Sequence, residues 1–268
     1  MGPTCGAVQR NWFRVTWSCA LFLALSALPS NAQSPSLEVP PSTTVENSTI
    51  SVRALQIPRK AQDAFRHGTE LLAANQAAAS IPEFQRALRI FPEFYEARYK
   101  IGLASVNLHR YQDAQAAFEA SIELSKGRHP PSQFGLAVAL CAQKQYSEAE
   151  EAVRAGLDQV PADAAGNFTL AWILFSAGKL AEAEKSARQA ILSNSNLASA
   201  YLLLAQIHLR RSDLPAVVSA LDAYLRLDPA GPHNAQAQAL RTEAQQLLAK
   251  HPGTAPVVAE SPAKNREP

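Results

Sequence analysis

A period of about 34 residues recurs along the middle of the chain, and it restricts the fold more than any other feature. Small residues recur at the eighth position of each unit: Gly68, Gly102, Ala137, Ala171 and Ala205. One two-helix unit of this length cannot bury its apolar face alone, so the units must stack into a continuous core. Five units align, with His129 inserted between the second and the third, at residues 61–94, 95–128, 130–163, 164–197 and 198–231.

Two further positions of the unit are also small in most copies, and proline closes three of the five units. The twentieth position holds Ser80, Ala114, Ala149, Ala183 and Val217. The twenty-seventh position holds Ala87, Ser121, Gly156, Ala190 and Tyr224. The closing residues are Pro92, Pro161 and Pro229, each of which stops a helix by removing a donor and crowding the preceding turn.

With these spacings the sequence resembles the tetratricopeptide-repeat (TPR) family over residues 61–231. The resemblance implies an all-α fold, a right-handed α-α superhelical solenoid of about five TPR units. Residues 232–250 are apolar at helical spacing, which predicts a C-terminal capping helix over the last unit. The fifth unit is predicted to be divergent or distorted, because Pro215, Val217 and Tyr224 depart from the pattern.

The two ends of the chain are predicted to lie outside the repeats. Residues 1–32 contain two arginines, then an apolar run, then small residues before Ala32. This order indicates a secretory signal peptide. Residues 33–60 are expected to be an extended linker, and residues 251–268 a disordered tail. We therefore expect export, most simply to the periplasm. Secretion, or anchoring to the membrane by an uncleaved signal sequence, is the alternative.

Charge and composition argue against several classes of function. The chain has 25 basic and 23 acidic residues, and Arg10 and Arg14 of the leader account for the difference. A neutral mature chain lacks the basic footprint that nucleic-acid binding requires. Cys141 lies in mid-helix without a neighbouring His or Asp, and the six histidines form no ligand pair. We expect no enzyme activity, metal, cofactor or small-molecule substrate, and a core position for His67.

The resemblance also implies that the first helix of each unit lines a concave groove. Its groove-facing positions here carry a series of rings, which we predict to bind a partner protein or peptide: Phe65, Tyr99, Phe134, Phe168, Trp172 and Phe175. Aromatic anchors of this kind suit an extended or helical apolar segment. The alternative is that these rings are ordinary packing between repeats.

The sequence thus favours an exported scaffold that binds a partner peptide or helix in the TPR groove. The rival hypothesis is a structural subunit of an envelope complex, whose groove is occupied by its own residues 37–57. The groove positions lack the lysine and asparagine with which the family's chaperone-binding members hold a terminal carboxylate, so binding of a chaperone tail is not expected.

Overall fold

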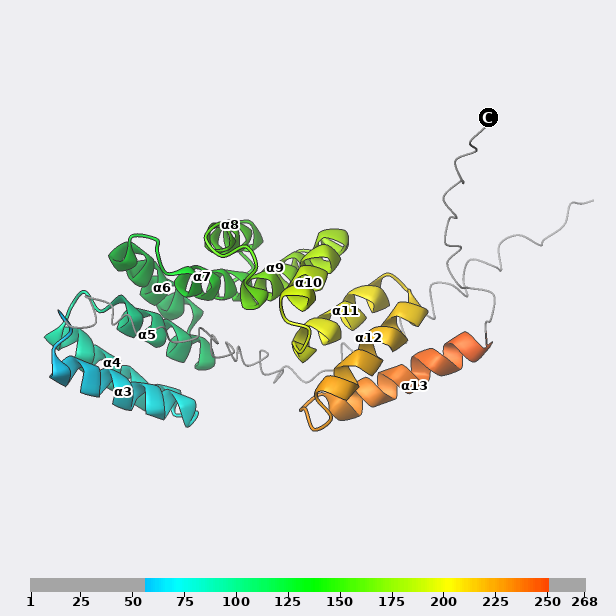
Figure 1. Cartoon of the computed structure of the whole chain (residues 1–268), viewed down its shortest axis with the longest axis horizontal. Helices are drawn as coiled ribbons and strands as arrows, with labels where there is room; N and C mark the ends of the chain where they lie inside the picture. Colours follow the sequence, from blue (N-terminus) through cyan, green and yellow to red (C-terminus); the bar gives the residue numbers. More distant parts are fainter. Residues whose placement is uncertain (1–55, 251–268) are drawn as a thin grey trace, which may run out of the picture. The chain divides into compact units, whose positions relative to one another are not determined.

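The computed structural model describes residues 56–250, which contain eleven helices and no strand (Figure 1). The predicted signal peptide, most of the predicted linker and the predicted tail lie outside the described residues. The all-α prediction is confirmed. The helices are α3 (Arg59–Ala73), α4 (Ala77–Ile90), α5 (Tyr95–Asn107), α6 (Tyr111–Ser125), α7 (Pro130–Ala142), α8 (Tyr146–Leu157), α9 (Ala164–Ser176), α10 (Leu180–Ser193), α11 (Ala198–Arg210), α12 (Leu214–Leu227) and α13 (Asn234–Lys250).

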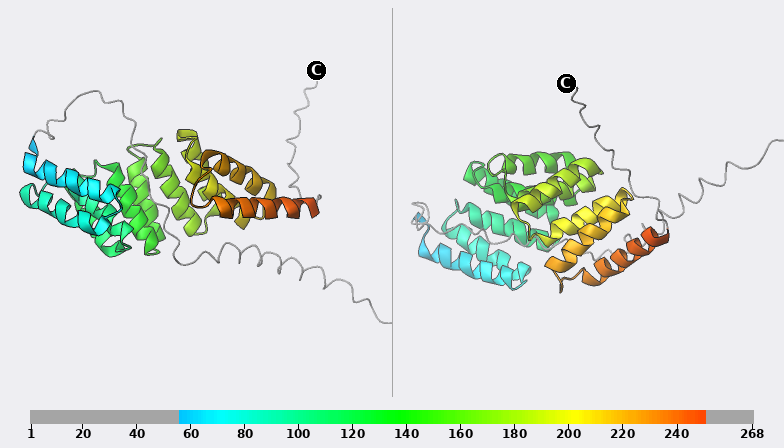
Figure 2. Two further views of the ribbon diagram at one scale, coloured as in Figure 1. Left: turned by 90° about the horizontal axis from the view of Figure 1, so that it is seen from below. Right: turned by 45° about the vertical axis from the view of Figure 1, so that its right-hand side comes forward.

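The first ten helices form five successive pairs, one pair for each 34-residue unit, and α13 packs on α12 (Figures 1 and 2). The first helix of each unit contacts the first helix of the next, from α3 to α11. Among the described residues, by contrast, no second helix touches another second helix. The first helices therefore make one continuous face, which we call the inner face.

The turn inside each unit has the same backbone conformation in all five copies. The fifteenth residue of every unit has a positive φ, at Asn75, His109, Lys144, Gly178 and Ser212. Such a left-handed residue satisfies the free carbonyls at a helix end and turns the chain back on itself. Four of the five residues carry a side chain, so this turn does not require glycine.

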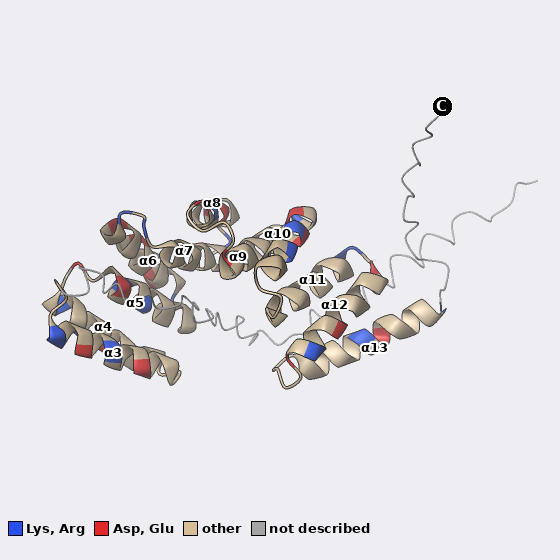
Figure 3. Cartoon of the chain, viewed as in Figure 1, with Lys and Arg blue, Asp and Glu red and all other residues tan. Residues whose placement is uncertain are grey.

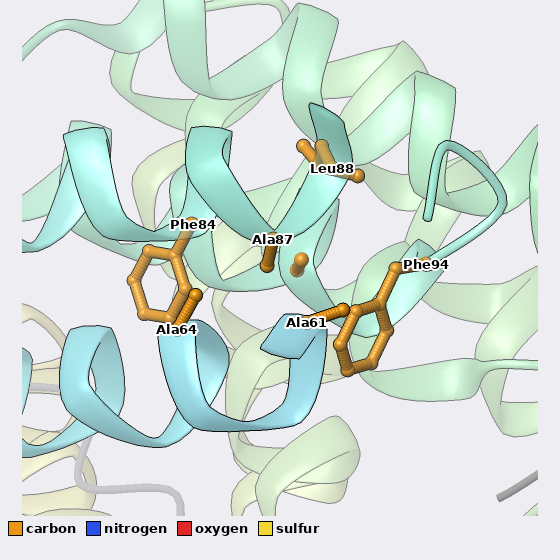
Figure 4. Close-up of a cluster of buried hydrophobic side chains, with 7 residues drawn as sticks. Ala61, Ala64, Phe84, Ala87, Leu88 and Phe94 are labelled. Atoms are coloured by element: carbon orange, nitrogen blue, oxygen red, sulfur yellow. The ribbon is translucent and has the colours of Figure 1, made fainter. Parts of the chain in front are cut away.

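The core is made by matched large and small side chains. Phe84 is fully buried among Ala61, Ala64 and Ala87, with Phe94 beside them (Figure 4). A β-carbon added at Gly68 would lie 2.8 Å from a carbon of the Phe84 ring. In the first unit the eighth position is therefore small because the Phe84 ring, from the second helix, occupies the space beside it.

The fifth unit differs in sequence but keeps the helix pair. Pro215 lies in the first turn of α12, where the missing N–H breaks no helical bond. The Asp213 side chain accepts a hydrogen bond from the Ala216 N–H at 3.2 Å and caps the helix. Tyr224 is buried on the helix that α13 covers. The fifth unit thus forms a helix pair like the other four.

Candidate protein-binding face

The inner face is lined by side chains that are only partly buried. The ninth position of every unit is half-buried, at Thr69, Leu103, Val138, Trp172 and Gln206. This row lies on the helices that contact one another from unit to unit. It therefore offers one side chain per repeat to a ligand that runs along the inner face.

The predicted rings at the fifth position make packing contacts, beginning with the first unit. The Phe65 ring centroid lies 4.7 Å from that of Phe94 and 5.7 Å from that of Phe84. Phe65 is half-buried against the cluster of buried residues around Phe84 and Phe94, which we call the first core cluster. Both partner rings belong to the first unit, so much of the Phe65 ring is used for packing within that unit.

Tyr99 repeats this arrangement in the second unit. Its ring lies 5.9 Å from Phe118 and 5.0 Å from His129, the inserted residue. Only 8% of Tyr99 is exposed, and this burial raises the pKa of its hydroxyl to about 12. A tyrosine in this state contributes mainly to the core.

Phe134 is the third ring, and it joins the third unit to the fourth. A β-carbon added at Gly166 would lie 2.6 Å from its ring, and one added at Gly156 would also collide with it. Gly156 belongs to α8 and Gly166 to α9. For Phe65, Tyr99 and Phe134 the contacts thus match the packing alternative, while binding of a partner by these rings stays a prediction.

The rings of the fourth unit are arranged differently. Phe168 and Trp172 are half-buried, and Phe175 is buried. The Trp172 and Phe175 rings lie 6.1 Å apart. The Arg210 guanidinium carbon, from α11, lies 4.1 Å from the centroid of the Phe175 ring. Trp172, Phe175 and Arg210 together form a surface that we call the ledge.

Sequence reasoning missed Arg210, although a signal for it was present. Arg210 occupies the thirteenth position of the fifth unit, which the family resemblance places among the groove-facing positions. Its Nη1 also donates to the Phe175 carbonyl oxygen, at 3.5 Å. The position was visible in the sequence, but the contact with a ring of the preceding unit was not.

A cluster of charged side chains around a buried histidine lies where α10 meets α11. Glu184 and His208 are both buried, and Glu184 pairs with Arg188 and Arg211. His208 Nε2 lies 3.9 Å from the Glu184 carboxylate, and Nδ1 lies 3.8 Å from that of Asp213. Burial lowers the pKa of His208, although both carboxylates act in the opposite direction. The ring is therefore held in its neutral form.

A pocket of about 250 Å³ lies beside this cluster, lined by Arg188, Tyr201, His208 and small residues of α12.

Among the histidines of residues 56–250, only His208 is buried. The expectation of a core position for His67 is wrong, because its side chain is 53% exposed and lies 3.5 Å from Glu83.

The described residues provide no obvious reactive centre. Cys141 is buried, and this burial raises the pKa of its thiol, which disfavours the nucleophilic thiolate. Residues 56–250 contain no group of three or more metal-ligating side chains. None of their helices has the length and hydropathy needed to cross a membrane.

Comparison with known families agrees with the fold. Two tetratricopeptide-repeat family models match, one over residues 106–173 and the other over residues 65–106 and 168–235. Together they cover more than half of the chain, which therefore belongs to the tetratricopeptide-repeat family. Proteins of this family are typically non-enzymatic scaffolds. No curated protein matches the sequence.

Solved structures of repeat proteins are similar at low sequence identity. PilW, a type IV pilus biogenesis factor, is 15% identical with a TM-score of 0.61, over 74% of this chain and 96% of its own. TTC0263, a thermophilic TPR protein of Thermus thermophilus, is 18% identical with a TM-score of 0.60, over 69% of this chain and 99% of its own. A MamA RS-1 double mutant is 19% identical with a TM-score of 0.55, over 65% of this chain and 97% of its own. At these identities the likeness concerns the fold.

Proposed function

We propose that this protein is an exported scaffold that binds an extended or helical segment of a partner protein along its inner face. The observation that carries the proposal is the ninth-position row, half-buried in all five units on helices that contact one another. A half-buried side chain is held in place by the fold and still has surface to lose on binding. Such preorganised contacts favour association because little conformational entropy remains to be lost.

The chemistry of this face suits an apolar segment. Leu103, Val138 and Trp172 make the centre of the row apolar, and tryptophan is a frequent anchor in protein interfaces. The solved structure of YrrB, with a TM-score of 0.51 to this chain, is described as a TPR protein with an unusual peptide-binding site. That description supports peptide binding as the first function to test.

The test is affinity capture from the cell envelope with a variant of the inner face. Phe134 and Phe175 are unsuitable targets because both are embedded in the repeats, so the variant carries Leu103→Ser and Trp172→Ala. Leu192→Ser is the matched control, since Leu192 is 79% exposed on α10, a second helix. All variants are first checked for helix content by circular dichroism.

A partner that the parent and the Leu192→Ser control retain, and that the inner-face variant loses, would support the proposal. Retention of the same partners by all three proteins would contradict it. Export is tested separately by the mass of the protein recovered from the envelope. We expect a chain that begins at Gln33, and recovery of a chain with residues 1–32 intact would contradict cleavage.

The rival function is a structural subunit whose inner face is filled by its own residues 37–57. One observation favours it: Ile57 packs against the first core cluster, and its carbonyl accepts a hydrogen bond from the Gln62 side chain at 2.9 Å. A deletion of residues 33–55 keeps Ile57 and tests the rival. A large loss of thermal stability would favour self-occupation, whereas an unchanged melting temperature would favour a free inner face.

A further inference from the structure

Arg210 is a charged residue on an otherwise uncharged part of the inner face. The three helices α7, α9 and α11 contain no other Lys, Arg, Asp or Glu, and Figure 3 shows α7 and α9 almost entirely in the colour of uncharged residues. Among the ion pairs of the described residues, Arg188 and Arg211 pair with Glu184, but Arg210 takes part in none. The otherwise uncharged first helices of the last three repeats thus end in one cation without a carboxylate partner among the described residues.

The side chain of Arg210 is held in position although it is exposed. Its guanidinium stacks on the buried Phe175 ring at 4.1 Å and donates one hydrogen bond to the Phe175 carbonyl. Stacking on a ring fixes the plane of a guanidinium and leaves the donors at its edge free. A planar fork with two free parallel donors is suited to a carboxylate, which it can bind in bidentate geometry.

The other half of the ledge is apolar. Trp172 is half-buried one helical turn before Phe175, with the two rings 6.1 Å apart. Beyond Trp172 the ninth-position row continues on α7 with Val138. A ligand on the ledge therefore meets a cation on one side and a tryptophan ring on the other.

We propose that the ledge recognises an Asp or Glu side chain that lies next to an aromatic or aliphatic residue in the partner segment. The carboxylate pairs with Arg210, and the apolar neighbour packs on Trp172. This inference rests on the proposed function and names the chemistry of the segment. A side chain is favoured over a terminal carboxylate, because capture of a terminus uses several converging donors and these three helices supply one charged group.

The experiment is a selection of random 12-residue peptides, displayed on phage, against the full-length protein. Parallel selections use Arg210→Gln, Trp172→Ala and Arg226→Gln. Arg226→Gln is the charge-matched control, because Arg226 is also exposed and lies in the last turn of α12, a second helix. We expect the parent and the control to enrich peptides with an acid beside an apolar residue, and Arg210→Gln to lose the acid while it keeps the apolar residue.

The affinity of the best peptide is then measured by fluorescence anisotropy, beside a version with Gln or Asn in place of its acid. We expect the amide version to bind the parent about tenfold more weakly or worse, which is typical of a lost charged hydrogen bond. Arg210→Gln should bind both versions equally. Arg210→Lys should recover only part of the difference, because lysine lacks the planar fork.

The outcomes separate this inference from the function on which it rests. Peptides that need Trp172 but show no preference for an acid would overturn the inference and leave the proposed function standing. Loss of binding on amidation of the peptide's C-terminus, without an effect of the internal acid, would also overturn it. If no selected peptide depends on Trp172, both the inference and inner-face binding fail.

Discussion

The first two units and the last three use the same helix pair but differ in what their inner helices carry. Helices α3 and α5 contain several charged residues each, whereas α7, α9 and α11 contain only Arg210. The close approach of the helices also differs. Gly68 and Gly102 face Phe84 and Phe118 in the first two units, and from the third unit onward the eighth position is alanine.

The repeat thus accepts two arrangements at this contact, a glycine that faces a phenylalanine ring or an alanine that faces a smaller residue. At the position of Phe84 and Phe118 the later units carry Val153, Ala187 and Leu221. A smaller residue on the second helix thus accompanies the added methyl group on the first. The helix pair forms with either arrangement, and the later units also differ from the first two in the near absence of charge on their first helices.

The largest effect is expected for Phe134→Ala, which removes the ring held between the third and fourth units. Truncation of a fully buried phenylalanine costs about 3–5 kcal/mol of unfolding free energy. Phe134 is half-buried, and we expect a loss near the lower end of this range because its ring fills the space beside Gly156 and Gly166. Trp172→Ala is the comparison. Both rings are half-buried, but we expect a smaller loss for Trp172 because no glycine of the described residues packs against its ring. Urea denaturation followed by circular dichroism measures both. Equal losses would show that Trp172 is as much a core residue as Phe134.

Gly102→Leu comes next, because a β-carbon at this position already lies 2.5 Å from the Phe118 ring. We expect overpacking to cost about 1–3 kcal/mol in the same assay. A Gln112→Leu control adds the same side chain at an exposed position of α6 and should leave the stability nearly unchanged. If the two variants were equally stable, the assignment of Gly102 to a close-approach position would be wrong.

A double-mutant cycle tests directly whether the eighth position and the facing residue of the second helix are coupled. Gly102→Ala and Phe118→Val together reproduce the Ala137 and Val153 pair of the third unit. Each single change should destabilise, and the double variant should be more stable than the sum of the two losses by about 1 kcal/mol. Strict additivity of the two losses would contradict the idea that the two residues share the space between the helices.

The smallest expected effect is the contribution of His208 to the pH dependence of stability. His208 lies in the fifth unit and is 6% exposed. Its pKa in the folded state is lowered, so the unfolded chain binds the proton more readily. The stabilising contribution is complete above about pH 6.5, the ordinary pKa of histidine, and is lost as the pH falls through the folded-state value. For one proton the slope stays below about 1.4 kcal/mol per pH unit.

Urea midpoints at pH 7.5 and 5.0 measure this contribution. His208→Gln should lose less stability between the two pH values than the parent. An unchanged pH dependence in His208→Gln would indicate that the ring is not held neutral. Glu184, Asp213, Arg188 and Arg211 are kept in every variant because all four charges act on His208.

Much of the fold could be predicted from the sequence because the repeat reports the same packing five times. The helix pairs coincide with the predicted units, although α3 begins at Arg59, two residues before the predicted start. The candidate site was harder to predict. Phe65, Tyr99 and Phe134 share a groove-facing position with Phe168, but how much of each ring is covered depends on residues of the next unit, such as Gly166 beside Phe134.

The inserted residue His129 illustrates the same limit. The insertion is visible in the alignment of the units, but its contacts are not. In the structure His129 Nδ1 lies 2.7 Å from the Ser132 hydroxyl, which lies 2.8 Å from that of Ser121. Ser121 in turn donates to the Tyr95 carbonyl oxygen at 2.9 Å. The extra residue thus belongs to a hydrogen-bonded chain that joins the second and third units.

The sequence by itself determined the helix pairs, their order and the positions of close approach, since these follow from local helical periodicity and from side-chain size at fixed spacings. Only the tertiary structure decided which side chains keep exposed surface and which charges find partners. Arg210 lies far along the chain from Phe175, and stacks on its ring only because α9 and α11 come together. Burial and charge pairing depend on such contacts between units, which a local pattern does not contain.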